Sequence, residues 1–145
     1  MKRYVSILSF LCISLIISAQ KTFWLGADIS GTTDVETRHV QLRNSNGEPR
    51  ECTALMRELG LNAVRLRVWV NPKDGLCGKD DVVKMARRAN DWGMALMIDF
   101  HYSDWWADPG QQNIPAAWKE MNYEQMKHAL AEHTREVLQA IKEAG

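Results

Sequence analysis

Hydrophobic and polar residues alternate along this chain with a period that changes repeatedly, and each change marks a new element of secondary structure. Three short apolar segments, at residues 22–28, 61–70 and 94–102, predict buried β-strands. The middle segment alternates strictly and is broken by Asn71-Pro72, which ends the strand there. None of the strands is joined to the next by a hairpin signal.

Between these strands the apolar residues recur at helical spacing. Residues 51–59 and 80–92 are predicted as helices, and each is followed by a glycine that can end it. A last helix is predicted from Asn122 to about Ala144, with Asn122 and Gln125 placed to form a capping box.

The resulting order is strand, helix, strand, helix, strand, helix, with a polar loop at residues 29–49 between the first strand and the first helix. This order predicts parallel strands joined by crossover helices, as in an α/β sheet or barrel. A closed TIM (β/α)8 barrel has eight strands and about 250 residues, so this chain has room for only its first three β/α units. We therefore expect part of a larger barrel, and a small open sheet is the alternative.

The N-terminus has the pattern of a secretory signal. Two basic residues precede the apolar run Val5–Ile17, and the small residues Ser18 and Ala19 follow it. A membrane anchor is the alternative, but the run is short for a membrane span and contains three serines. We expect residues 1–19 to be a signal peptide and residues 20–145 to be the exported, N-terminal part of the barrel.

The charge balance narrows the class of ligand. The chain has 18 basic and 18 acidic residues and therefore no net charge to attract nucleic acid or an anionic membrane surface. We expect neither as a partner.

Export also changes the interpretation of the cysteines. Once Cys12 is removed with the signal, Cys52 and Cys77 remain as a pair in an oxidising compartment. Both positions are predicted at the carboxyl end of the sheet, which favours a Cys52–Cys77 disulfide. The alternative is two unrelated buried thiols.

The second strand carries charges where a buried parallel strand should be apolar on both faces. With a period of two, one face takes Val64, Leu66 and Val68, and the other takes Arg65, Arg67 and Trp69. Buried arginines need carboxylate partners, because an isolated buried charge is very unfavourable. On the third strand Asp99 and His101 share a face. We predict a polar site at the carboxyl ends of the strands, where active sites of such folds lie, lined by these four side chains: Arg65, Arg67, Asp99 and His101. The alternative is an ion-pair network that only stabilises the fold.

Aromatic residues follow the third strand. Trp105, Trp106 and Trp118 fall in or near a loop that is too irregular to form a helical core stripe. Aromatic faces with a polar rim suit sugar rings, whose C–H surfaces stack while their hydroxyls form hydrogen bonds. At least one of the three indoles is expected to pack within the loop. The further candidates for sugar contact are Asp28, Asp104 and Asp108.

A metal site is the alternative for Asp99, His101, Asp104 and Asp108. These residue types can bind metals, but no helical His-Glu pattern or cysteine spacing supports such a site. We expect no metal and no cofactor. His128 and His133, five positions apart on the last predicted helix, do not share a face and are expected to be solvated.

The segments "GADIS", "LNAVRLRVWVNP" and "MIDFHYSDWWADPGQQNIPAAW" resemble glycoside hydrolase family 53, the endo-β-1,4-galactanases that cut arabinogalactan. The resemblance covers essentially all of the chain after the signal. It implies a (β/α)8 barrel that retains anomeric configuration by means of two glutamates. The pattern Asn-x-x-Arg places an arginine that supports the nucleophile at Arg65, and the DFH pattern places a sugar-binding histidine at His101.

In the family the acid/base glutamate ends the fourth strand and the nucleophile ends the seventh, so the resemblance implies that both lie beyond Gly145. We expect the chain to be the first part of a secreted, monomeric galactanase whose substrate is galactan or arabinogalactan. The alternative is a carbohydrate-binding protein that uses the same aromatic cleft without catalysis.

Overall fold

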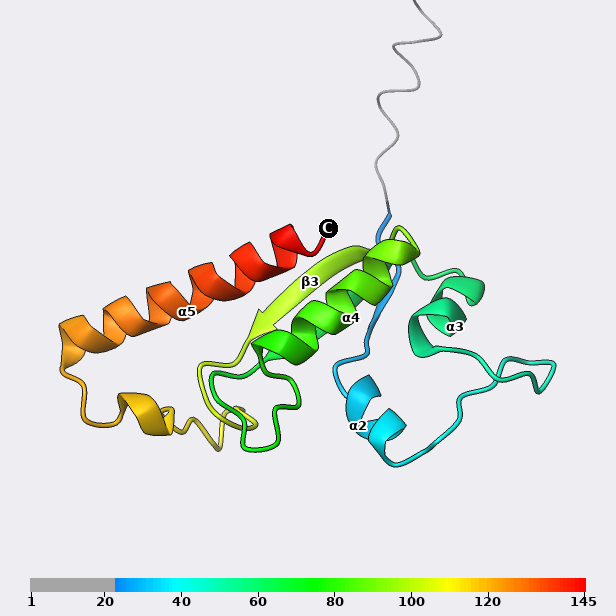
Figure 1. Cartoon of the computed structure of the whole chain (residues 1–145). Coiled ribbons are helices and arrows are strands. Elements are labelled where there is room, and N and C mark those ends of the chain that lie inside the picture. The colour runs from blue at the N-terminus through cyan, green and yellow to red at the C-terminus, as the bar shows by residue number, and fades with distance from the viewer. Residues whose placement is uncertain (1–22) are drawn as a thin grey trace, which may run out of the picture.

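The computed structural model describes residues 23–145, and its strands form one parallel sheet (Figure 1). The strands are β1 (Gly26–Asp28), β2 (Ala63–Val68) and β3 (Ala95–Phe100), in the order β1-β2-β3. The parallel arrangement that the sequence predicts is therefore confirmed. The predicted signal peptide lies outside the described residues.

The helices lie on one face of this sheet or at its ends. They are α2 (Thr32–Thr37), α3 (Cys52–Glu58), α4 (Lys79–Asp91), the short 3-10 helix η1 (Ala116–Trp118) and α5 (Tyr123–Glu143). Helix α4 packs on β2 and β3, and α5 lies along α4 (Figure 1). The predicted capping box forms at the start of α5, where the Asn122 and Gln125 side chains each accept a hydrogen bond from the other residue's backbone N–H. Within residues 23–145 no helix combines the length and apolar character needed to cross a bilayer.

The core lies between the sheet and α4. The predicted apolar face of β2 (Val64, Leu66 and Val68) is almost completely buried there. Met85 and Ala89 of α4 and Val137 of α5 pack in the same core cluster. The other face of β2 is left for the polar side chains, as its alternation predicts.

Helix α2 lies inside a segment that is predicted as a loop. The helix is short, and no side chain caps its start. Its contacts come from distant parts of the chain: Thr33 Oγ1 donates to Asp81 Oδ2 at 2.9 Å, and Arg88 Nη2 lies 2.5 Å from Glu36 Oε1. Isolated helices of this length are not stable in water, so packing against α4 stabilises it.

The predicted Cys52–Cys77 disulfide is wrong, because both cysteines are free and buried. Each sulfur has its own surroundings: Sγ of Cys52 lies 3.3 Å from Thr32 Oγ1, and the thiol of Cys77 donates to the carbonyl of Ser30 at 3.3 Å. Burial is the main effect on both thiols and raises their pKa values.

His133 is not solvated as predicted. Its ring lies among three aromatic rings, with centroid distances of 6.0 Å to Phe100, 6.4 Å to Tyr102 and 6.3 Å to Trp118. Its Nε2 is buried and has no hydrogen-bond partner within residues 23–145. Burial lowers the pKa of His133; the nearby charge of Glu136 opposes the shift and that of Lys79 adds to it.

We predict that both thiols are free in the purified protein and react slowly until it unfolds, because only an exposed thiolate reacts readily. A chromogenic thiol reagent, applied with and without denaturant, measures this. Reduction of the native protein should leave its free energy of unfolding unchanged. Recovery of a Cys52–Cys77 cross-linked peptide by mass spectrometry would contradict the prediction.

We predict that His133 makes the protein less stable in mild acid. The unfolded histidine binds a proton near its ordinary pKa of about 6.5, whereas the folded one resists protonation. The free energy of unfolding should therefore fall as the pH drops below about 6.5 and on towards the lower folded pKa. His133→Phe should make this fall shallower in urea unfolding at a series of pH values.

His128→Phe is the matched control, because His128 lies on the same helix and is exposed. It shows how much of any change comes simply from placing a phenylalanine on this helix. The same dependence in wild type and His133→Phe would show that His133 is not responsible.

Candidate active site

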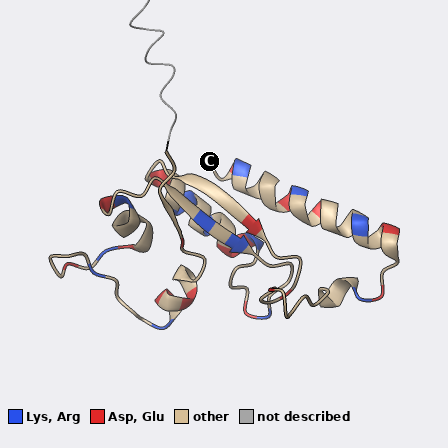
Figure 2. Cartoon of the chain, turned by 180° about the vertical axis from the view of Figure 1, so that it is seen from behind, with Lys and Arg blue, Asp and Glu red and all other residues tan. Residues whose placement is uncertain are grey.

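The carboxyl ends of the strands bring together the charged residues that the sequence singles out. The register pairs Asp28 with Arg65, and Arg67 with Asp99, across the sheet. Nε of Arg65 lies 3.2 Å from Asp28 Oδ2, and Nη2 donates to Asp99 Oδ2 at 2.6 Å. Figure 2 shows these basic positions within the sheet beside the acidic tip of the neighbouring strand. One guanidinium therefore joins carboxylates from both neighbouring strands.

His101 extends this network beyond the end of β3. Its Nε2 lies 3.1 Å from Asp99 Oδ2, and its Nδ1 lies 3.4 Å from the backbone N of Ala107. Because the Ala107 N–H can only donate, Nδ1 is the acceptor and Nε2 carries the hydrogen that Asp99 accepts. The side chain is mostly buried. Asp99 and His101, which the alternation places on one face, are thus in hydrogen-bond contact.

Asp28 is held on its other side by Ser30. The Ser30 hydroxyl donates to Asp28 Oδ1 at 2.6 Å, and the Ser30 N–H donates to the same oxygen at 2.9 Å. Burial opposes ionisation of this carboxyl, but these hydrogen bonds and the charges of Arg65 and Arg67 outweigh it and hold the pKa of Asp28 below its usual value. Ser30 was not among the sequence candidates, although it follows Asp28 by two residues in "GADIS".

Arg67 does not have the carboxylate partner that the sequence predicts. It is only 7% exposed, and its guanidinium carbon lies 3.9 Å from the ring centroid of Trp106 and 4.9 Å from that of Trp69. Its register partner is Asp99, whose Oδ2 is taken by Arg65 and His101. Cation–π contact therefore replaces the predicted ion pair.

Two indoles are available to a ligand. Trp105 is 53% exposed and Trp106 is 45% exposed, whereas Trp118 is buried and packs against Tyr102 and His133. Trp69 packs against both indoles: its ring centroid lies 4.8 Å from that of Trp105 and 6.1 Å from that of Trp106. A pocket of about 280 Å³ lies between these indoles and the loops after β1 and β2. The alternation along β2 places Trp69 beside Arg67, but no other sequence signal gave it this supporting role.

Asp104 and Asp108 hold the loop that carries the indoles. The carboxylate of Asp104 accepts the N–H of Asn71 at 3.0 Å and that of Ala116 at 2.8 Å, while Asp108 accepts the N–H of Gly110 at 2.7 Å. Within residues 23–145 no three metal-binding side chains converge on a common point.

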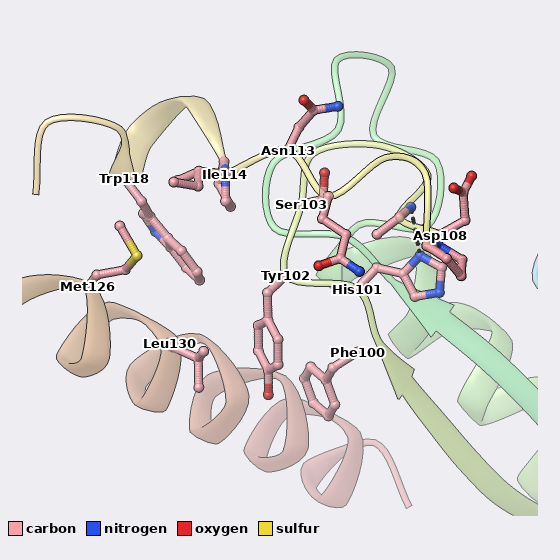
Figure 3. Close-up of a pocket in the computed structure, with 14 residues that line it drawn as sticks. Phe100, His101, Tyr102, Ser103, Asp108, Asn113, Ile114, Trp118, Met126 and Leu130 are labelled. Carbon is pink, nitrogen blue, oxygen red and sulfur yellow. Dashed lines mark hydrogen bonds between the residues drawn. The ribbon is translucent and has the colours of Figure 1, made fainter. Parts of the chain in front are cut away.

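A larger pocket of about 520 Å³ opens between this loop and α5 (Figure 3). Figure 3 shows His101 and Asp108 on one side of it and Trp118, Met126 and Leu130 on the other. His101 thus lies between the polar network on the sheet and this second hollow.

The chemistry of the cluster follows from its charges and shape. Arg65 is 45% exposed, so its guanidinium can still reach a further carboxylate and favour that group's ionised form. No glutamate ends a strand within residues 23–145. The exposed indoles and the polar rim beside them fit a neutral, hydroxyl-rich ring.

The sequence of this chain is similar to those of known proteins. The model of Glycosyl hydrolase family 53 matches residues 24–145. The chain is 36% identical over 133 residues to the endo-beta-1,4-galactanase of Bacillus subtilis, covering 86% of this chain and 31% of the relative. It is 37% identical over 131 residues to the probable arabinogalactan endo-beta-1,4-galactanase A of Aspergillus terreus, covering 90% of this chain and 37% of the relative.

Two solved structures are also similar to this chain in fold and in sequence. The GH53 catalytic domain of Ignisphaera aggregans superposes with a TM-score of 0.79 at 32% identity, over 84% of this chain and 36% of that one. A structure from a study of two fungal beta-1,4-galactanases gives a TM-score of 0.80 at 35% identity, over 86% and 37%. The parallel sheet and its helices are thus part of a (β/α)8 barrel. The chain spans about a third of the length of these proteins. On its sequence and on its structure, this chain belongs to glycoside hydrolase family 53.

Proposed function

We propose that the whole protein is a secreted endo-β-1,4-galactanase, which hydrolyses the galactosidic bonds of galactan or arabinogalactan. The observation that carries the proposal is the Arg65 bridge between Asp28 and Asp99, which lies beside two half-exposed indoles at the carboxyl ends of the strands. The relatives named as galactanases support the choice of substrate. The apolar run Val5–Ile17 supports export.

The polysaccharide would bind along the aromatic wall. Trp105 and Trp106 offer apolar faces on which the C–H surface of a galactosyl unit can stack. Asp99 lies beside the wall and can accept hydrogen bonds from sugar hydroxyls, and His101, whose ring nitrogens are held by Asp99 and Ala107, lies edge-on to Trp106.

Cleavage with retention needs an acid/base and a nucleophile about 5 Å apart on opposite sides of the bond. Both carboxylates would come from the remaining strands of the barrel. Arg65 would then lie beside the nucleophile and favour its ionised form, with Asp28 and Asp99 fixing the direction of the guanidinium.

The direct test is release of reducing sugar from β-1,4-galactan by the purified whole protein, with β-1,4-xylan as a control substrate. The proposal expects hydrolysis of galactan, and NMR of the first products should show the β anomer. Hydrolysis of xylan but not galactan, or products with the α anomer, would overturn it.

We predict that Arg65→Ala in the whole protein lowers kcat by about 10²-fold or more, as expected for loss of a group that stabilises charge at the reacting centre. The two ion pairs are partly exposed, so the free energy of unfolding should fall by only about 1 kcal/mol. Steady-state kinetics and urea unfolding measure the two effects.

Arg135→Ala is the matched control, because Arg135 is an exposed arginine paired with Glu132 on α5. It should keep wild-type kcat. A folded Arg65→Ala protein with wild-type turnover would exclude the proposed role.

We predict that residues 20–145 produced alone hydrolyse no galactan. The glutamates of this segment lie in loops and helices, and none ends a strand. The sheet also has open edges at β1 and β3, so poor solubility or loose packing is expected. Reducing-sugar release is the assay. Activity that disappears when one glutamate of the segment is replaced would show that the active site has been misplaced.

A further inference from the structure

Ser30 is a buried residue in the loop after β1, and its hydroxyl lies between β1 and β2. The hydroxyl accepts the backbone N–H of Arg67 at 2.7 Å and donates to Asp28 Oδ1 at 2.6 Å. A hydroxyl has a single hydrogen, and a backbone N–H can only donate. The direction of this relay is therefore fixed, and the hydrogen of Ser30 must point to Asp28.

This relay sets the orientation of the Asp28 carboxylate. Oδ1 accepts two hydrogen bonds from Ser30, one from its hydroxyl and one from its N–H. Oδ2 is thereby turned towards Nε of Arg65, at 3.2 Å. Both oxygens of Asp28 therefore have protein partners.

Arg65 depends on this orientation because its side chain is long and partly exposed. Asp99 holds only one terminal nitrogen, Nη2, and leaves the guanidinium free to turn about that contact. The second contact, the ion pair of Nε with Oδ2 of Asp28 at 3.2 Å, limits how far the group can turn. Without it, Arg65 could adopt many rotamers of similar energy.

We propose that Ser30 and Asp28 are positioning residues of the galactanase: Ser30 fixes the carboxylate of Asp28, and the ion pair with Asp28 keeps the guanidinium of Arg65 where it meets the nucleophile. The inference rests on the proposed function for its catalytic part, while the link from Ser30 to Asp28 can be tested without substrate. A merely structural role would leave kcat unchanged in the folded enzyme.

The kinetic test uses Ser30→Ala in the whole protein. We expect kcat on galactan to fall about tenfold, the size expected for losing a hydrogen bond to a charged group, with KM changed by less than about twofold. The acid limb of the kcat/KM profile should move to higher pH, because a misplaced Arg65 favours the ionised nucleophile less.

Thr32→Val is the matched control. Thr32 is similarly buried at the start of α2, but its hydroxyl donates to the carbonyl of Ile29 and not to Asp28. It should lose stability while keeping kcat and the acid limb. Asp28→Asn preserves the shape of the side chain and should reproduce the kinetic effects of Ser30→Ala, so the test stands even if Ser30→Ala fails to fold.

The second test follows the carboxyl carbon of Asp28 by NMR in the substrate-free whole protein. Ser30→Ala should raise the pKa of Asp28 towards its usual value, and Thr32→Val should leave it unchanged. If the pKa of Asp28 is unchanged in Ser30→Ala, the proposal is overturned. If Ser30→Ala does not fold, wild-type kinetics of Asp28→Asn overturn it instead.

A raised pKa with wild-type kcat and acid limb overturns the step from Asp28 to Arg65. If the wild-type protein does not hydrolyse galactan, the proposed function fails, and the NMR result alone decides whether Ser30 orients Asp28.

Discussion

A guanidinium in the middle of a parallel sheet is the constraint on which this site depends. The middle strand of a parallel sheet is normally apolar, and a charge on it is stabilised when carboxylates lie on the neighbouring strands. Arg65 meets that condition because the parallel register brings Asp28 and Asp99 to its two sides. The apolar core lies behind the strand, so this arrangement of charges does not disturb the packing against α4.

The three βα loops are joined by side chains that also define the site. Ser30 lies in the first loop, and its hydroxyl accepts a hydrogen bond from the backbone N–H of Arg67. Its backbone carbonyl accepts a hydrogen bond from the thiol of Cys77 in the second loop. Asp104, in the third loop, accepts the N–H of Asn71 in the second. Loops that carry binding groups must be held by a rigid scaffold, and these contacts supply part of it. The indoles of the third loop therefore lie at a defined position above the sheet.

Two arginines on the same face of one strand have different roles because their neighbours differ. Arg65 has carboxylates on both sides and remains partly exposed. Arg67, two residues on, is covered by indoles and has no free carboxylate beside it, so its charge interacts with the ring faces. Its planar guanidinium also supports the exposed ring of Trp106, which would be less well ordered without it.

The sequence by itself determined the strands, the main helices, the parallel order and the face on which Arg65, Asp99 and His101 lie. These features follow from the period of hydrophobicity and from caps such as that of Asn122, which act over a few residues. Only the tertiary structure decided the partner of Arg67, the separate surroundings of Cys52 and Cys77, and the burial of His133. Helix α2 and the part played by Ser30 belong with them. Each depends on side chains far apart in the chain meeting at a particular angle and distance, which local periodicity does not encode.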